Sequence, residues 1–267
     1  MKTARLYLDL SASAARIGVA NLRATVTWQS WAFGWLGRLI TQALFFTSFG
    51  LWLGSRTATD FMATGNSIVV VCIEALVVIP LLVADRYFGA LTLHVAAPAN
   101  FIVSYFARNI QCPIIGIFSG TVAFFVVTAI FSVPVPWPAA LLVPVLLAMI
   151  GFSAYAYGFA ISSVVMRYPS VQMVALNFSY LSLMAFCGVN VPVTFWPAPL
   201  HGLAEIFPLT HGLEAVRGVL AGAPNGLIWR NAALEVLVGL GWLTVGTVMF
   251  GATARAGRQK GNLELSG

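Results

Sequence analysis

Apolar residues are grouped in runs of about 20, the length that an α-helix needs to cross a hydrocarbon core about 30 Å thick. The pattern predicts six membrane-spanning helices, and a further segment at 200–221 is too interrupted by polar residues to span. The predicted spans are Phe33–Leu53, Thr64–Val83, Ile110–Val133, Ala139–Val165, Met173–Val193 and Asn231–Ala252. We therefore expect an all-α integral membrane protein with a single transmembrane domain over residues 1–267.

Residues 1–32, ahead of the first span, have the pattern of an amphipathic helix. Arg5, Arg16 and Arg23 fall within about 20° of one another on a helical wheel. Leucine and isoleucine side chains avoid that sector, and they are Leu6, Leu10, Ile17 and Leu22. Trp28, Trp31 and Trp35 follow at helical spacing, as in an aromatic belt at a membrane surface. This pattern predicts an interfacial helix, and a loosely ordered basic tail is the alternative.

Composition supports lipid as the solvent for most of the exterior. The chain is 60% hydrophobic and only 8% charged, against about 25% charged in ordinary soluble domains. Its net charge of +6 could suggest nucleic acid, but the basic residues lie between the spans instead of forming one basic face. We expect no nucleic-acid binding.

The basic residues also predict the orientation. With a cytoplasmic N-terminus, eleven of the 14 fall inside: Lys2, Arg5, Arg16, Arg23, Arg38, Arg86, Arg108, Arg167, Arg255, Arg258 and Lys260. Arg56, Arg217 and Arg230 fall outside. Because cytoplasmic loops carry the excess of Lys and Arg, both termini are expected in the cytoplasm, with residues 253–267 as a cytoplasmic tail.

Ionisable groups inside predicted spans are candidates for function, because their burial in lipid costs about 2.5–3.5 kcal/mol. Glu74 lies midway along the second span and could contact substrate or hydrogen-bond a neighbouring helix. Glu235 lies near the outer start of the last span and is expected at the interface. Aromatic side chains could line an apolar route or simply pack the bundle, and these are Phe45, Phe46, Phe49, Phe178, Tyr180 and Phe186.

Enzymatic chemistry finds little support. The sequence has no nucleotide-binding loop, zinc motif or nucleophile elbow. The histidines His94, His201 and His211 are far apart, so no shared metal site is expected. The cysteines Cys72, Cys112 and Cys187 lie in apolar runs and are expected to be small core residues.

The segment that follows the second span carries a first family resemblance. Ala84 to Pro98 reads ADRYFGALTLHVAAP, with an acid-arginine pair, a Gly-x-Leu-Thr-Leu core and a later proline. It resembles the first cytoplasmic loop of type-2 ABC exporter permeases, which forms a coupling helix that docks on the ATP-binding subunit. Ala90 and Asp85 depart from the residues usual there, Thr and Glu. The resemblance implies that the coupling residues are Asp85, Arg86, Tyr87, Phe88, Gly89, Leu91 and Pro98, with a lesser contact at Arg167.

The segment between the last two spans carries the stronger resemblance. It contains Gly188-Val189-Asn190-Val191-Pro192 and later Phe207-Pro208-Leu209-Thr210-His211, followed by Glu214-Ala-Val-Arg217. It is similar to the extracellular re-entrant helical hairpin of the same permeases. Half-length helices near Leu200–Ile206 and Thr210–Ala221 can stay in a membrane only if protein shields their open ends. This indicates a gate that covers the outer end of a pathway. The expected gate residues are Pro192, Pro208, His211, Glu214 and Arg217, with Glu214 and Arg217 forming a pair. A role of this pair in local structure alone is the alternative.

The resemblance implies a non-catalytic permease subunit of an ATP-driven exporter in the bacterial cytoplasmic membrane. It implies a dimer of this chain, or a pair with a related permease, above two ATPase subunits that hold ATP and magnesium, so that this chain binds no cofactor. The expected cargo is a hydrophobic drug or natural product, because the spans carry few polar groups, and the candidate pathway residues are Glu74, Phe45, Phe49, Phe178 and Tyr180.

Three alternatives remain open. The same mechanism could export a polysaccharide or a lipid-linked glycan. An ion-coupled carrier would need several buried acids, and only Glu74 clearly qualifies. A membrane-embedded enzyme would need clustered catalytic side chains.

Overall fold

The computed structural model describes residues 2–87 and 101–260, and these residues form helices joined by short turns, without a β-strand among them. The α-helices are α1 (Lys2–Thr25), α2 (Gly37–Trp52), α3 (Arg56–Leu76), α4 (Val78–Tyr87), α6 (Phe101–Arg108), α7 (Gln111–Ile130), α8 (Val143–Val165), α9 (Gln172–Phe186), α10 (Ala198–Ile206), α11 (Thr210–Leu220) and α12 (Asn225–Lys260). A π-helix (Ser30–Leu36) leads into α2, and short 3₁₀-helices cover Ala139–Leu142, Pro169–Val171 and Val193–Phe195.

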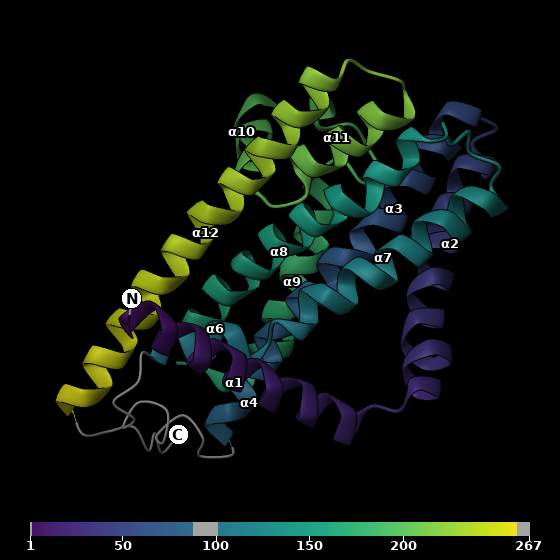
Figure 1. Cartoon of the computed structure of the whole chain (residues 1–267). Helices are drawn as coiled ribbons and strands as arrows, with labels where there is room; N and C mark the ends of the chain where they lie inside the picture. Colours follow the sequence, from purple (N-terminus) through teal and green to yellow (C-terminus); the bar gives the residue numbers. More distant parts are fainter. Residues whose placement is uncertain (1, 88–100, 261–267) are drawn as a thin grey trace.

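The long helices run between two ends of one bundle (Figure 1). Helix α1 crosses one end, where α4 and the C-terminal part of α12 also lie, and α10 and α11 lie at the opposite end. We call these the α1 end and the hairpin end. The arrangement separates the two segments that carried the family resemblance, because α4 leads into one of them and α10 and α11 form the other.

Helix α3 forms the centre of the bundle and packs against α2, α7 and α8. Every residue from Ala63 to Leu76 is buried. The α-helix is interrupted at Val77, which lies between the end of α3 at Leu76 and the start of α4 at Val78. Pro80 explains this break, because proline lacks an N–H and its ring clashes with the carbonyl of the residue four positions earlier, Leu76.

Small residues allow α7 to approach α3 closely. A Cβ added at Gly116 would lie 2.9 Å from the carbonyl oxygen of Val71, and one at Gly120 would overlap the side chain of Val71. The two glycines are four residues apart and therefore share one face, as in the Gly-x-x-x-Gly contacts of membrane helices. Side chains at these positions would push the two helices apart.

Four helical stretches of the described residues are long and apolar enough to cross a membrane: Arg56–Ala84, Ile102–Ile130, Ala139–Val165 and Asn225–Thr253. They correspond to the second, third, fourth and sixth predicted spans. Helices α2 and α9 have 16 and 15 residues, which gives about 24 and 22 Å of helix against a core about 30 Å thick. The π-helix lengthens α2 at its N-terminal side, and the count of six spans stays a prediction.

The N-terminal segment is helical, which excludes the loosely ordered tail. Ala14 and Gly18 of α1 are buried, and a Cβ at Gly18 would overlap the carbonyl oxygen of Arg108 at the end of α6. Arg16 and Arg23 are exposed. Helix α1 thus turns its small residues toward the bundle and these two arginines away from it. That α1 lies in the membrane surface stays a prediction.

Candidate functional site

Helices α10 and α11 form a helical hairpin whose turn is buried. The turn consists of Phe207, Pro208 and Leu209; Pro208 is buried and Leu209 is 0% exposed. Leu209 has a φ of 96°, a conformation that costs about 1–3 kcal/mol in a residue with a side chain unless the surroundings hold it in place. The neighbouring side chains provide that support.

Three side chains bind the last three carbonyl oxygens of α10, which have no partner within the helix. The pairs are Thr210 Oγ1 with Ala204 (2.6 Å), His211 Nε2 with Glu205 (3.2 Å) and Trp242 Nε1 with Ile206 (2.8 Å). Thr210 and His211 belong to the Pro-Leu-Thr-His motif, so the motif has a structural role in closing the turn. Trp242 comes from α12 and ties the hairpin to the last long helix.

Glu235 of α12 caps the N-terminus of α11. Its Oε1 accepts a hydrogen bond from the backbone N–H of Leu209 at 2.8 Å, and its Oε2 accepts one from Gly212 at 2.9 Å. A carboxylate is stabilised there because the first N–H groups of a helix lack partners and carry partial positive charge. Glu235 is 0% exposed, so it is buried against the hairpin, and its depth at the membrane interface stays a prediction. The sequence signal for a buried role was that Glu235 is a single acidic residue within an apolar run.

Arg217 of α11 is directed toward α3 and the turn after α9. Its Nη2 donates to the carbonyl oxygen of Gly188 at 2.7 Å and to that of Phe61 at 3.2 Å. The guanidinium also lies 3.5 Å from the centre of the Phe61 ring. Glu214 is exposed, and no ion pair within 4.0 Å joins it to Arg217 in the described part of the chain, which corrects the predicted pair. Arg217 therefore connects three parts of the hairpin end.

The turn Gly188–Asn190, which we call the α9 turn, is held against α3. Asn66 donates from Nδ2 to Oδ1 of Asn190 at 2.9 Å, and Asn66 is only 2% exposed. A Cβ at Gly65 would overlap the carbonyl oxygen of Val189, so only glycine allows this approach. The sequence did not predict this contact, because nothing in the local pattern links residues 124 positions apart.

The predicted gate residues all lie at the hairpin end, in two groups. His211, Glu214 and Arg217 share a hollow of about 470 Å³. Pro208 lies in the hairpin turn, and Pro192 precedes the 3₁₀-helix Val193–Phe195. The remaining charged side chains that line the hollow are Glu205 and Arg230. Hydrogen bonds to backbone groups thus hold the turn of the hairpin, and charged side chains line the hollow beside it.

Glu74 lies in the packed contact between α3 and α7. It is 6% exposed and accepts a hydrogen bond from Ser119 Oγ at 3.0 Å. Ser119 lies between the two glycines that let α7 approach α3. Glu74 thus forms a hydrogen bond to a neighbouring helix, and its contact with substrate stays a prediction.

The candidate pathway aromatics come from α2 and α9. Phe45, Phe49 and Phe178 are exposed, and Phe45 packs edge-on against Phe49 with ring centres 5.3 Å apart. Gln42 of α2 donates to the hydroxyl of Tyr180 of α9, so the two helices are joined at this level. The two remaining aromatics of the predicted set are half-buried: Phe46 packs against the core and Phe186 stacks on Phe207.

The coupling residues are only partly described. Asp85, Arg86 and Tyr87 form the last turn of α4, at the α1 end (Figure 1). Phe88, Gly89, Leu91, His94 and Pro98 lie outside the described residues. Arg167 is exposed in the turn after α8, and its Nη2 lies 3.4 Å from Thr253 Oγ1 of α12.

A protein-family model matches most of the chain. The family model described as ABC-2 type transporter matches residues 19–221. The matched range runs from the second half of α1 to the end of the hairpin. No curated protein matches the chain.

Proposed function

Because the chain belongs to the ABC-2 type transporter family, we propose that it is the permease subunit of an exporter that moves a hydrophobic drug or natural product out of the cell. In this proposal ATP and magnesium are held by a separate ATP-binding-cassette subunit. Two copies of this chain, or this chain and a related permease, enclose the pathway above two such ATPases. The chain itself catalyses no reaction.

The observation that carries the proposal is the separation of a docking segment from a closed hairpin by the length of the bundle. Asp85 and Arg86 lie in the last turn of α4 at the α1 end, and α10 and α11 lie at the opposite end (Figure 1). A motor that binds the α1 end must act on the hairpin through the helices between them. Both termini and the α1 end face the cytoplasm in this proposal, following the distribution of basic residues.

Helix α3 offers the mechanical connection. It is joined to α4 through the break at Val77, and its outer half binds the hairpin end at two points. Phe61 accepts from Arg217 of α11, and Asn66 binds Asn190 of the α9 turn. A push on α4 that tilts α3 would displace both partners together, because a packed helix moves as a unit. Opening of the outer gate then follows from a movement that begins at the ATPase.

The α2–α9 surface supports an apolar cargo. Phe45, Phe49 and Phe178 are 46–71% exposed in the single chain, and Tyr180 of α9 accepts a hydrogen bond from Gln42 of α2. Two copies that face each other through this surface would enclose a route lined mainly by aromatic rings. Such a route stabilises an apolar solute better than a hydrated sugar chain, since it offers few hydrogen-bonding groups.

A complex with an ATPase is the first test. When the tagged chain is purified with a co-expressed ATP-binding-cassette subunit, we expect both to elute as one complex of two permease chains and two ATPase chains. ATP hydrolysis by the subunit is expected to rise on reconstitution with the chain. Elution of the chain without any cognate ATPase, under conditions in which it stays folded, would contradict the proposal.

A further inference from the structure

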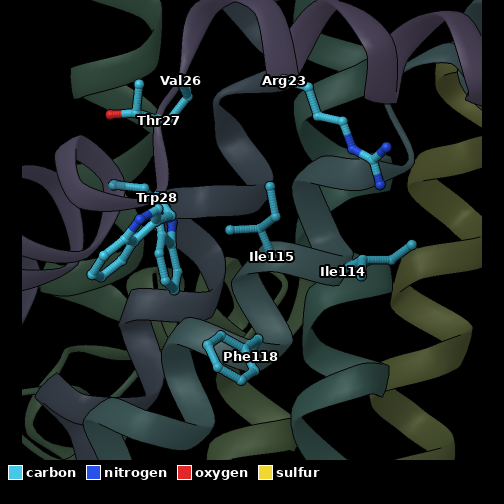
Figure 2. A pocket seen from close by; sticks show the side chains of 8 residues that line it. Arg23, Val26, Thr27, Trp28, Ile114, Ile115 and Phe118 are labelled. Atoms are coloured by element: carbon cyan, nitrogen blue, oxygen red, sulfur yellow. The ribbon is translucent and has the colours of Figure 1, made fainter.

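A hollow of about 580 Å³ lies where the end of α1 and the link to α2 face the first turns of α7 (Figure 2). Its size falls in the range of small-molecule sites, about 300–1,000 Å³. We call it the α1–α7 slot. Its lining residues are Arg23, Val26, Thr27, Trp28, Trp31, Ile114, Ile115 and Phe118. Six of the eight are apolar or aromatic, which sets the character of the ligand.

The walls of the slot are large apolar side chains that remain uncovered in the single chain. Trp28, Ile114 and Phe118 are each 58–68% exposed. Ile114 and Phe118 are four residues apart, so the slot extends about 6 Å along α7, away from the α1 end. Trp31 packs against Phe118, with ring centres 5.7 Å apart, and closes one side. Figure 2 shows Ile114, Ile115 and Phe118 following the helix down from the link.

The corner that carries the two tryptophans is fixed by a reciprocal cap. Ser30 N donates to Thr27 Oγ1 at 3.2 Å, and Thr27 N donates to Ser30 Oγ at 3.1 Å. This arrangement satisfies two N–H groups at the start of the helix and sets the angle at which the chain enters it. The backbone that carries Trp28 and Trp31 is therefore fixed without a ligand.

Positive charge lies at the slot's edge. Arg23 lines the slot and also lines a second hollow of about 630 Å³ on α1, together with Ala15, Arg16, Val19 and Ala20. Arg16 and Arg23 are seven residues apart, which places them two turns apart on one face. The small side chains between them leave room around both guanidinium groups. The only acid of α1, Asp9, lies two further turns from the slot.

We infer that the α1–α7 slot binds an anionic phospholipid of the membrane leaflet at the α1 end. One acyl chain lies along Ile114 and Phe118, and the phosphate of the headgroup contacts Arg23 and Arg16. A phospholipid is the occupant because the apolar slot ends at two arginines beside a tryptophan belt. Across a membrane interface the acyl chains are likewise followed by charged headgroups. The inference requires that the chain is embedded in a membrane and is independent of what the protein exports.

Quenching by brominated lipids tests the inference. The purified full chain is titrated with phosphatidylglycerol or phosphatidylcholine carrying dibrominated acyl chains, and the fluorescence quenching lost in Trp28→Phe is assigned to the slot. We expect phosphatidylglycerol to bind several-fold more tightly. Arg23→Gln should weaken phosphatidylglycerol about fivefold, since a basic residue near an anionic surface contributes about 1 kcal/mol, and should leave phosphatidylcholine unchanged.

Arg255→Gln is the matched control, because Arg255 is an exposed arginine on the C-terminal part of α12, at the same end of the bundle. It should leave both affinities as in the unmodified chain. Ile114→Phe narrows the slot and should weaken both lipids. Equal affinities for the two lipids, or equal effects of Arg23→Gln and Arg255→Gln, would overturn the inference. Loss of the Trp28 signal when a second copy or an ATPase binds would also overturn it, since protein would then cover the slot.

Discussion

Glu235→Ala is expected to lower the free energy of unfolding by about 2–6 kcal/mol. Removal of the carboxylate leaves the N–H groups of Leu209 and Gly212 buried without an acceptor, at a cost of about 1–3 kcal/mol for each. Thermal unfolding of the purified chain in detergent measures the change. Protease sensitivity should rise first near Leu209, because this residue loses the contact that holds its positive φ.

Two matched variants make the result specific. Glu235→Gln keeps one carbonyl acceptor and should fall between the unmodified chain and Glu235→Ala. Glu214→Ala removes an exposed acid from α11 and should leave stability nearly unchanged. If Glu235→Ala unfolds at the same temperature as Glu214→Ala, Glu235 does not hold the hairpin and the role given to its two hydrogen bonds is wrong.

Exchange of the charges in Asp85→Arg with Arg86→Asp is expected to abolish ATP-dependent export. The two residues end α4 at the predicted docking surface, where like charges brought together across an interface cost several kcal/mol. Because each change of about 1.4 kcal/mol alters an affinity tenfold, the affinity of the ATPase for the chain should fall by about 30-fold or more. Binding of the purified ATPase to the reconstituted chain measures the loss, and transport by the same vesicles follows it.

A pair of the same residue types at the hairpin end of the bundle provides the control. Arg56 and Asp60 form an ion pair of 3.1 Å on α3, at the hairpin end, so Arg56→Asp with Asp60→Arg exchanges the charges of a pair that no ATPase should touch. This variant is expected to retain ATPase binding. Unchanged export by the exchange at 85 and 86 would contradict the assignment of the coupling segment.

The sequence was most informative where one pattern repeats along a helix. Runs of apolar residues predicted the long helices. Arg16 and Arg23, seven residues apart on one helical face, predicted α1. The Pro-Leu-Thr-His motif located the hairpin because its residues act locally, within six positions of their partners. These features depend on neighbours in the chain, which is why they can be read from it.

Contacts between distant segments could not be predicted in the same way. Glu235 binds residues 23 and 26 positions earlier, and Arg217 reaches a carbonyl 156 positions earlier. Spacing on α11 favoured the pair of Arg217 with Glu214. The contact with α3 and the α9 turn prevailed because two partly buried carbonyl oxygens need a donor more than an exposed carboxylate does. The hydrogen bond of Glu74 to Ser119 likewise depends on the approach of α7 to α3.

Transport into inside-out membrane vesicles tests the central claim most directly. Vesicles that contain the chain and its ATPase are supplied with a hydrophobic dye, with ATP or with a non-hydrolysable analogue, while the ion gradients are collapsed. The account predicts accumulation of the dye inside the vesicles only when ATP is hydrolysed. Accumulation that persists without hydrolysis, or that depends on an ion gradient instead, would contradict it.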